Sequence, residues 1–414
     1  MANTAERVRT PTSPYVRGET PGTSSAISIP RIASLDVVRG LVMVLMAIDH
    51  VRVYSGLPAG GPAPGIFFTR WITHFVAPAF VFLAGTAIYL HRRKVPDVNA
   101  LSRFLLTRGA WLILLELTVI RVSWTFNFDF AHYMLAGVIW MIGWCMILMA
   151  ALVHLPVMAN AVAGGAIIVL HNLLDYAPAF KESLGAGALS AVWKVLYLGG
   201  GFELWNGGPP LLVLFVIVPW IGVMMTGYAF GKVMELPASE RKSMCLKIGL
   251  AVTAAFVALR AVDVYGDPRH WRNVQNAAPA LIRFLNTSKY PASLQFLTMT
   301  LGPMFLLIAA VENARSRVAK VLTTFGRVPF FYYVLHIPLI HLAACIVSLI
   351  REGRVNPWLF TNHPLAPGDL PPNYRWSLGL LYLVWAICVF ALYFPCRWFA
   401  NLKATRRSPW LSYL

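Results

Sequence analysis

The chain has 414 residues, of which 58% are hydrophobic and 13% are charged, and its mean hydropathy is +0.63. A soluble domain carries about 25% charged residues, so this composition excludes an ordinary soluble protein and indicates an integral membrane protein. The net charge of +18 could suggest a nucleic-acid partner, but its distribution along the chain gives another explanation.

The chain falls into three predicted parts. Residues 1–30 are rich in Pro, Ser, Thr and Arg, which predicts a disordered cytoplasmic tail without the apolar region of a signal peptide. Residues 31–400 predict an all-α, polytopic transmembrane domain, because their apolar runs suit helices of about 20 residues and do not alternate. Residues 401–414 predict a basic cytoplasmic tail.

Ten membrane spans are expected in the central part. They lie near residues 34–54, 70–90, 104–122, 133–153, 157–173, 211–231, 247–264, 293–311, 328–350 and 377–399. The run 157–173 is the shortest, and its full crossing is left open.

Lysine and arginine give the orientation of these spans. With the N-terminus inside, the short inner segments hold 20 of the 35 Lys and Arg residues, whereas the outer segments are longer and more dilute in charge. This pattern follows the positive-inside rule, so both termini are predicted to be cytoplasmic and no nucleic-acid partner is needed. The five cysteines have the spacing of neither metal ligands nor a disulfide framework, so no metal is expected.

The first span, DVVRGLVMVLMAIDH at 36–50, carries polar groups at both ends. Arg39 and His50 are eleven residues apart, which is about three turns plus 20°, so they share one helical face about 16 Å apart along the axis. Asp36 lies one turn before Arg39 and can pair with it. Asp49 points about 80° away from Arg39, toward His50 or an adjacent helix.

These positions suggest the two ends of one substrate. An arginine near the cytoplasm can hold phosphate through several fixed donors, and a histidine near the outer face can act as general base. Acyl-coenzyme A has a phosphorylated head and a long arm ending in a thioester, so it fits that separation. The alternative is that Asp36–Arg39 is an interfacial ion pair and Asp49–His50 a hydrated helix end.

Other polar residues are weaker candidates. His74 begins the second span on the side of His50 and could orient His50 or an acceptor; equally, it could face lipid headgroups. Asp129 and His132 are outer loop residues. Glu116 lies within the third span, between Arg108 and Arg121, and needs a partner that is either functional or structural.

Two segments on the cytoplasmic side could contact the coenzyme. Tyr332 and His336 share a face about a third of the way up the ninth span, where Pro338 frees a carbonyl group, and they could line a coenzyme passage or form a satisfied core. Arg92 and Arg93, in HRRK at 91–94, could hold phosphates, although such runs are usually topology determinants.

Five segments of the chain resemble those of a known family. RIASLDVVRGLVMVLMAIDH, FVAPAFVFLAGTAIYL, VPWIGVMMTGYAFGK, KYPASLQFLTMTLGP and GRVPFFYYVLHIPLIH resemble segments of bacterial proteins with the heparan-α-glucosaminide N-acetyltransferase catalytic domain, also called a domain of unknown function. The resemblance covers about residues 31–400 and extends more distantly to the acyltransferase-3 proteins. It implies transfer of an acetyl or other acyl group from cytoplasmic coenzyme A to an acceptor on the far side.

The resemblance also bears on single residues. In the acyltransferase-3 branch the functional arginine and histidine have the spacing of Arg39 and His50. The lysosomal branch has an asparagine at the position of His50 and its proposed catalytic histidine in the next loop. Here that loop, SGLPAGGPAPGIFF, has no histidine, so the expected catalytic residue is His50, supported by Asp49, with His74 next.

The sequence therefore predicts a multi-pass acyltransferase of the inner (plasma) membrane. Its expected partners are membrane lipid, acetyl-CoA or another acyl-CoA as co-substrate, and an envelope glycan or sugar acceptor. Pairing with a second copy in a homodimer is left open. Direct transfer and a transient acyl-histidine both remain open. The alternatives are a transporter with a path through Asp36, Arg39, Glu116 and His336, and an inactive scaffold.

Overall fold

The computed structural model describes residues 31–176, 188–273, 278–363 and 370–406. The predicted tail at 1–30 and most of the predicted tail at 401–414 lie outside these residues. The chain divides into two units, Met1–Arg31 and Ile32–Leu414, and the description below concerns the second unit alone.

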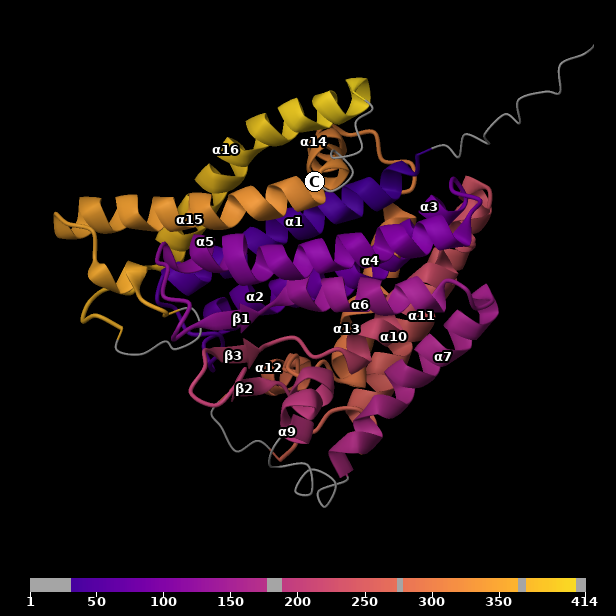
Figure 1. The fold of residues 1–414 in the computed structure, drawn as a ribbon, viewed down its shortest axis with the longest axis horizontal. Helices are drawn as coiled ribbons and strands as arrows, with labels where there is room; N and C mark the ends of the chain where they lie inside the picture. The colour runs from indigo at the N-terminus through magenta and orange to yellow at the C-terminus, as the bar shows by residue number, and fades with distance from the viewer. Residues whose placement is uncertain (1–30, 177–187, 274–277, 364–369, 407–414) are drawn as a thin grey trace, which may run out of the picture. The chain divides into compact units, whose positions relative to one another are not determined.

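The second unit is mainly helical (Figure 1). The elements in chain order, with η marking short 3-10 or π segments, are α1 (Ala33–Tyr54), α2 (Pro64–Trp71), η1 (Ile72–Phe75), α3 (Val76–Arg92), α4 (Val98–Leu115), η2 (Glu116–Ile120), α5 (Arg121–Thr125), β1 (Met134–Ala136), α6 (Val138–Leu152), α7 (Val157–Leu170), η3 (His171–Tyr176), α9 (Ala188–Trp193), η4 (Lys194–Leu198), β2 (Gly200–Glu203), β3 (Pro210–Val213), α10 (Val218–Phe230), η5 (Val233–Glu235), α11 (Ala238–Val262), α12 (Ala280–Leu285), α13 (Leu294–Ala310), α14 (Arg317–Arg327), α15 (Pro329–Glu352), η6 (Pro357–Phe360) and α16 (Leu378–Thr405).

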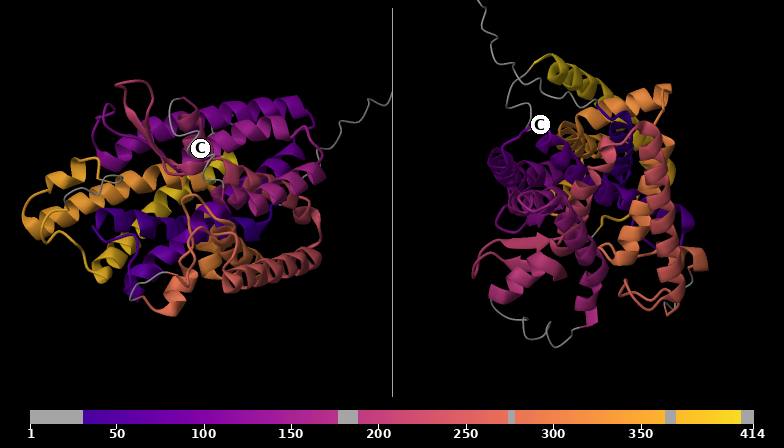
Figure 2. Two further views of the ribbon diagram at one scale, coloured as in Figure 1. Left: turned by 90° about the horizontal axis from the view of Figure 1, so that it is seen from below. Right: turned by 90° about the vertical axis from the view of Figure 1, so that its right-hand side faces the viewer.

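Helix α1 is the buried centre of this arrangement. It packs against α3, α13, α14, α15 and α16, and its apolar residues are buried on several sides (Figures 1 and 2). A helix that is apolar around its whole circumference is stable only in such an interior or in lipid. The polar residues of α1 therefore face other helices and the cavities between them.

Five of the described helical segments are long and apolar enough to cross a membrane. They are Pro64–Arg92, Val157–Tyr176, Ala238–Val262, Pro329–Glu352 and Leu378–Thr405. The second of these includes the run 157–173, which is therefore long enough to cross. The last continues past residue 400, so the helix extends into the predicted C-terminal tail. The count of ten spans and the orientation stay predictions.

Two of the predicted spans do not begin as helices, contrary to expectation. The starts of 133–153 and 211–231 form β1 and β3, and helix begins only at Val138 and Val218. With β2 they make a three-stranded sheet of order β1-β3-β2, in which β1 and β3 are parallel and β2 and β3 antiparallel. The strands satisfy one another's backbone groups, which lets extended chain exist beside the helices.

Helix also occurs where connecting segments were expected. The inner segment 312–327 contains α14, and the outer segment 174–210 contains the apolar helical stretch Leu189–Leu198. The third span is continuous from Val98 to Thr125, but it contains a π-helical stretch at Glu116–Ile120. Such a stretch turns the side chains that follow it and is frequent at functional sites.

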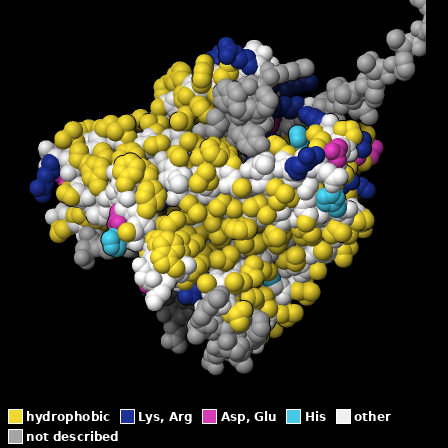
Figure 3. Space-filling view, viewed as in Figure 1, with side chains coloured by type: hydrophobic (Ala, Val, Ile, Leu, Met, Phe, Trp, Pro, Cys, Tyr) yellow, Lys and Arg dark blue, Asp and Glu magenta, His cyan; other side chains and the backbone are white. Residues whose placement is uncertain are grey.

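The surface is that of a membrane protein. One face of the second unit is broadly hydrophobic, with lysine and arginine toward its margins (Figure 3). Large apolar side chains on this surface come from neighbouring helices, for example Trp111 and Leu114 of α4 and Trp144 and Leu148 of α6. Soluble monomers rarely expose apolar patches of this kind, whereas lipid tails solvate them.

Two glycines fix α14 against the start of α1. A Cβ atom at Gly40 would overlap the carbonyl oxygen of Leu322, and a Cβ atom at Gly326 would overlap that of Asp36. Backbones approach this closely only where side chains are absent. The contact fixes the part of α1 that carries Asp36 and Arg39.

Gly40→Ala is therefore expected to destabilise the protein by about 1–3 kcal/mol or more, because the methyl group forces α14 away from α1. The matched control is Gly165→Ala on α7, where a Cβ atom would meet no other atom within 4 Å. Thermal unfolding in detergent should show a lower Tm for Gly40→Ala alone. Equal Tm values for the two variants would contradict the assignment.

Candidate active site

A first cavity of about 420 Å³ lies at the end of the second unit where α1 begins. It is bordered by the start of α1, the end of α3, the start of α4 and the start of α15, together with α6. We call it the inner cavity, after the predicted orientation. Most of its lining is apolar, and its charged or polar members include Arg39, Arg108 and His91.

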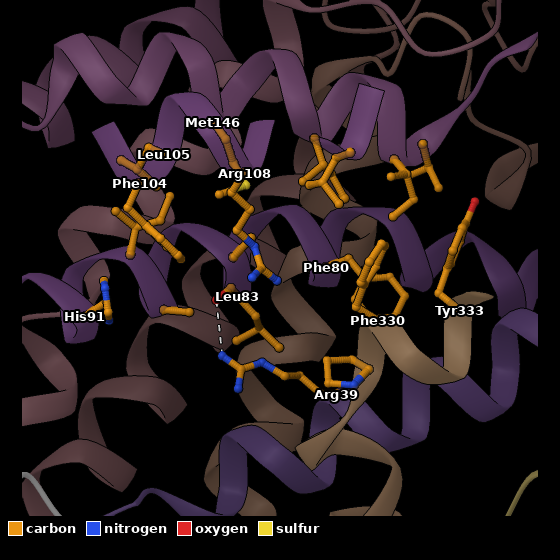
Figure 4. Close-up of a pocket in the computed structure, with 18 of the residues that line it drawn as sticks. Arg39, Phe80, Leu83, His91, Phe104, Leu105, Arg108, Met146, Phe330 and Tyr333 are labelled. Carbon is orange, nitrogen blue, oxygen red and sulfur yellow. Dashed lines mark hydrogen bonds between the residues drawn. The ribbon is translucent and has the colours of Figure 1, made fainter. Parts of the chain in front are cut away.

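The two arginines of the inner cavity come from opposite walls. Figure 4 shows Arg39 of α1 and Arg108 of α4 pointing toward the same part of the cavity, with His91 to one side. Arg39 donates to the carbonyl oxygen of Leu83 at 3.3 Å and pairs with Asp36 at 3.5 Å, as its sequence position predicts. Two guanidinium groups in an apolar cavity are suited to an anion such as phosphate, which several fixed N–H donors can bind.

A second cavity of about 390 Å³ lies at the other end of α1, and we call it the outer cavity. It is lined by the last turns of α1, by α2 and the start of α3, by the β1 and β3 strands, and by the loop before α13. Its charged and titratable members are Asp49, His50, Arg52, Arg70, Glu116, Lys289, Tyr290 and Tyr333. Each cavity has the size of a small-molecule site, about 300–1,000 Å³.

The two cavities meet along α1. Phe80, Val138 and Tyr333 line both of them. On α1 itself, Arg39 and Met43 line the inner cavity, and Met46 and His50 line the outer one, as the helical phase predicts. One face of one helix thus connects an arginine site to a histidine site.

His50 forms a hydrogen-bonded chain with α15. The His50 Nδ1 atom lies 2.5 Å from Nε2 of His336, and Nδ1 of His336 lies 2.6 Å from the carbonyl oxygen of Tyr333. Since a carbonyl oxygen only accepts, His336 carries its proton on Nδ1, and in the neutral ring Nε2 is an acceptor. His50 then donates from Nδ1, which leaves its Nε2 lone pair available to a group in the outer cavity.

Ring contacts hold the same arrangement. The imidazoles of His50 and His336 stack with centroids 4.7 Å apart, and Trp124 meets His50 edge-on at 4.8 Å. His336 lies in the first third of α15, yet it is level with the last turns of α1, because α15 projects beyond α1 (Figure 1). His336 therefore lies at the outer cavity end, not beside the inner cavity as its place in the span predicted.

Asp49 lies between two arginines and does not bond to His50. Its Oδ1 accepts from Arg52 at 2.8 Å, and its Oδ2 accepts from Arg70 of α2 at 2.6 Å. Of the two sequence alternatives, support of His50 or of an adjacent helix, the hydrogen bonds show the second. The carboxylate fixes α2 to α1 at the wall of the outer cavity.

Glu116 has a structural partner. Its side chain is 2% exposed, and Oε2 accepts from the backbone N–H of Ile139 in the first turn of α6 at 3.2 Å. A carboxylate at a helix N-terminus satisfies free N–H groups and is stabilised by the helix dipole. The partner expected for Glu116 is therefore a backbone amide, and neither Arg108 nor Arg121 is needed for this role.

The remaining sequence candidates lie outside both cavities. His74 is 6% exposed and meets Phe296 edge-on at 5.5 Å. Tyr332 is fully buried, with its ring against Phe325 and His336. Neither residue lines a cavity described above, so their catalytic and coenzyme-binding roles stay predictions.

The arginines of HRRK have protein partners. Arg92 donates to the carbonyl oxygen of Val153 and to the hydroxyl of Tyr228, each at 2.7 Å, and Arg93 pairs with Glu235 at 2.8 Å. These bonds connect α3 to neighbouring segments. They give both arginines a structural role, and the topology and phosphate-binding interpretations of HRRK both stay predictions.

The outer loop pair does not line either cavity. Asp129 and His132 lie 2.7 Å apart, and the His132 side chain is 78% exposed. The hydrogen bond from His132 lowers the pKa of Asp129 below its ordinary value. Nearby, Arg121 is fully buried and donates to the carbonyl oxygens of Asn127, Asp129 and Tyr133, so it holds this loop in place.

Several cavity residues had no assigned role from the sequence. They are His91 and Arg108 in the inner cavity, and Arg52, Arg70, Lys289 and Tyr333 in the outer cavity. Arg108 had a signal that could have identified it, because Leu101, Leu105, Arg108 and Leu112 form one helical stripe and all line the inner cavity. Lys289 begins KYPASLQFLTMTLGP, one of the segments that resemble the family, but it stands in an irregular loop whose place beside the cavity helical periodicity does not predict.

These features define a polytopic membrane protein with two adjoining small-molecule cavities along one buried helix. The family model for the heparan-α-glucosaminide N-acetyltransferase catalytic domain matches residues 31–262, which is more than half of the chain. The chain therefore belongs to this family, and the family makes it a membrane acetyltransferase. A search of curated proteins gives no match. The matched region includes Arg39, His50 and Arg108 but ends before Lys289 and His336.

Proposed function

We propose that this protein transfers an acetyl or related acyl group from cytoplasmic acyl-coenzyme A to an acceptor on the outer side of the plasma membrane. The observation that carries the proposal is that α1 lines both cavities, with Arg39 in one and His50 in the other. Family membership supports the acetyl-transfer chemistry. A sugar or other envelope glycan is the proposed acceptor, as the resemblance implies.

The inner cavity suits the coenzyme. Arg39 and Arg108 would bind its phosphates, and the apolar walls would enclose the pantetheine arm. The arm would extend along Met43 and past Phe80, Val138 and Tyr333 into the outer cavity. About 16 Å of helix separates Arg39 from His50, so the thioester can reach the histidine while the phosphates stay at the inner end.

The chemical step takes place in the outer cavity. His50 Nε2 accepts the proton of the acceptor hydroxyl or amine as its oxygen or nitrogen attacks the thioester carbonyl carbon. The new C–O or C–N bond forms, the C–S bond breaks, and the proton on His50 passes to the departing sulfur. The products are the acylated acceptor and free coenzyme A, so atoms and charge balance.

His336 is a positioning residue in this mechanism. By accepting from Nδ1 of His50 it fixes the tautomer in which Nε2 is the base. The carbonyl group of Tyr333 fixes His336 in turn. The arrangement has the same logic as a catalytic triad, in which a third group orients the base.

The direct test measures free thiol. Purified protein in detergent or vesicles is given acetyl-CoA with and without an amino sugar, and coenzyme A release is followed with a thiol reagent. Acceptor-dependent thiol release is expected. Failure to bind acetyl-CoA would rule out the proposal and favour the transporter or scaffold alternative.

The positioning role predicts a difference between two variants of one residue. His336→Phe keeps a ring beside His50 but removes the acceptor, so kcat should fall about 10-fold or more with KM for acetyl-CoA unchanged. His336→Gln offers an amide oxygen to His50 and should recover part of the rate and shift the pH profile. If both variants lose the same activity together with thermal stability, His336 has a packing role alone.

A further inference from the structure

Lys289 is brought to the outer cavity by a rigidly held loop. In this loop Asp267 accepts from the backbone N–H of Ser288 at 2.7 Å, and from the hydroxyl groups of Ser288 and Ser293 at 2.7 and 2.9 Å. Lys289 follows Ser288 directly and forms a backbone bridge with Ala292. The position of Lys289 is therefore set by a buried carboxylate and two hydroxyl groups.

The side chain of Lys289 is buried and lines the outer cavity. The residue is 9% exposed, and its Nζ lies 5.8 Å from the ring centre of Phe215 and 5.3 Å from that of Tyr290. Within the described part of the chain, its observed contacts are these two rings, no carboxylate pairs with it, and Nζ is not among the fully enclosed polar atoms. A positively charged group at the wall of a cavity, without a carboxylate partner, is suited to bind an anion there.

The two carboxylates of the outer cavity do not form an ion pair with Lys289. Both oxygens of Asp49 are taken by Arg52 and Arg70, and Glu116 bonds to the start of α6. Counted formally, the cavity lining has three cationic side chains, Arg52, Arg70 and Lys289, against two carboxylates. The excess positive charge favours a ligand that carries negative charge.

We propose that Lys289 binds an anionic oxygen group of the acceptor, so that the acceptor is an acidic sugar or glycan unit bearing a carboxylate or phosphate. The inference rests on the proposed function, because it assigns the acceptor class to the same cavity. The ammonium group binds the acid while His50 Nε2 receives the proton of the reacting hydroxyl or amine. Lys289 thereby selects the acceptor and orients it.

The test compares matched neutral and acidic acceptors in wild type, Lys289→Met and Lys289→Arg. Glucosamine is paired with glucosamine 6-phosphate, and glucose with glucuronic acid. Wild type should prefer the acidic member of at least one pair in kcat/KM. Lys289→Met should reduce this preference about 10-fold or more, and Lys289→Arg should retain part of it. Lys194→Met is the control. Lys194 lies in η4, within a segment predicted to be on the outer side, and it lines neither cavity.

Two outcomes would overturn the inference. One is a wild type without preference in either pair. The other is an equal loss of kcat for neutral and acidic acceptors in Lys289→Met, which would instead place the ammonium on the oxyanion of the transfer step. Calorimetric binding of the acidic sugars is measured in parallel and needs no turnover. Loss of that binding in Lys289→Met alone would support the anion site even if thiol release, and with it the proposed function, failed.

Discussion

His50→Ala is expected to lower acyl transfer by about 100- to 10,000-fold while acetyl-CoA binding is retained. The variant removes the group proposed to receive the acceptor proton, and it leaves untouched the inner-cavity side chains that are proposed to bind phosphate. The rate of thiol release and the affinity for acetyl-CoA should therefore respond independently.

The control for His50→Ala is the loss of another histidine on the same predicted side of the membrane. His132→Ala changes a histidine on the same predicted side that is exposed and lies outside both cavities. Its turnover should match that of wild type. Wild-type turnover in His50→Ala would show that another group is the base, and loss of acetyl-CoA binding there would show a collapsed site.

Arg39→Ala should show the opposite pattern, with a KM for acetyl-CoA raised about 10- to 100-fold and a smaller change in kcat. The expected size follows from losing charge-assisted hydrogen bonds to phosphate. Arg39→Lys should recover only part of the affinity, because an ammonium group cannot bind phosphate through a planar fork of donors.

Arg103→Ala is the matched control, since Arg103 is an exposed arginine on α4 that lies outside the inner cavity. Its KM should stay near the wild-type value. Shortened coenzyme fragments sharpen the comparison: a pantetheine thioester lacks the nucleotide phosphates, so Arg39→Ala and wild type should use it about equally. If wild type and Arg39→Ala showed the same ratio of kcat/KM for acetyl-CoA to kcat/KM for the pantetheine thioester, Arg39 would not bind phosphate.

The parts of the site that lie on one regular helix follow from the sequence. Arg39, Met43, Met46 and His50 line the cavities in the order that helical periodicity predicts, because α1 is an uninterrupted helix. The ion pair between Asp36 and Arg39 follows from the same spacing. Local geometry is sufficient for these residues.

The parts that depend on how segments meet do not follow from the sequence. The offset between α15 and α1 determines that His336 contacts His50, and span counting placed His336 nearer the cytoplasm. Lys289 lies at the outer cavity in a loop that Asp267, distant in the sequence, holds through Ser288 and Ser293. The strands β1 and β3 lie in runs that are apolar enough for helix, and their pairing with each other is a long-range contact.

The three side chains shared by the two cavities also bear on the integrity of the membrane. A transferase that exposes one face of a helix to both compartments must not become a leak for protons or ions. Phe80, Val138 and Tyr333 lie where the cavities meet, and two of the three are purely apolar. An acyl group on a thin, flexible arm can slip between such side chains, whereas a hydrated ion would have to shed its water there. If the proposed thioester passes here, these side chains are expected to admit it while opposing the passage of ions across the bilayer.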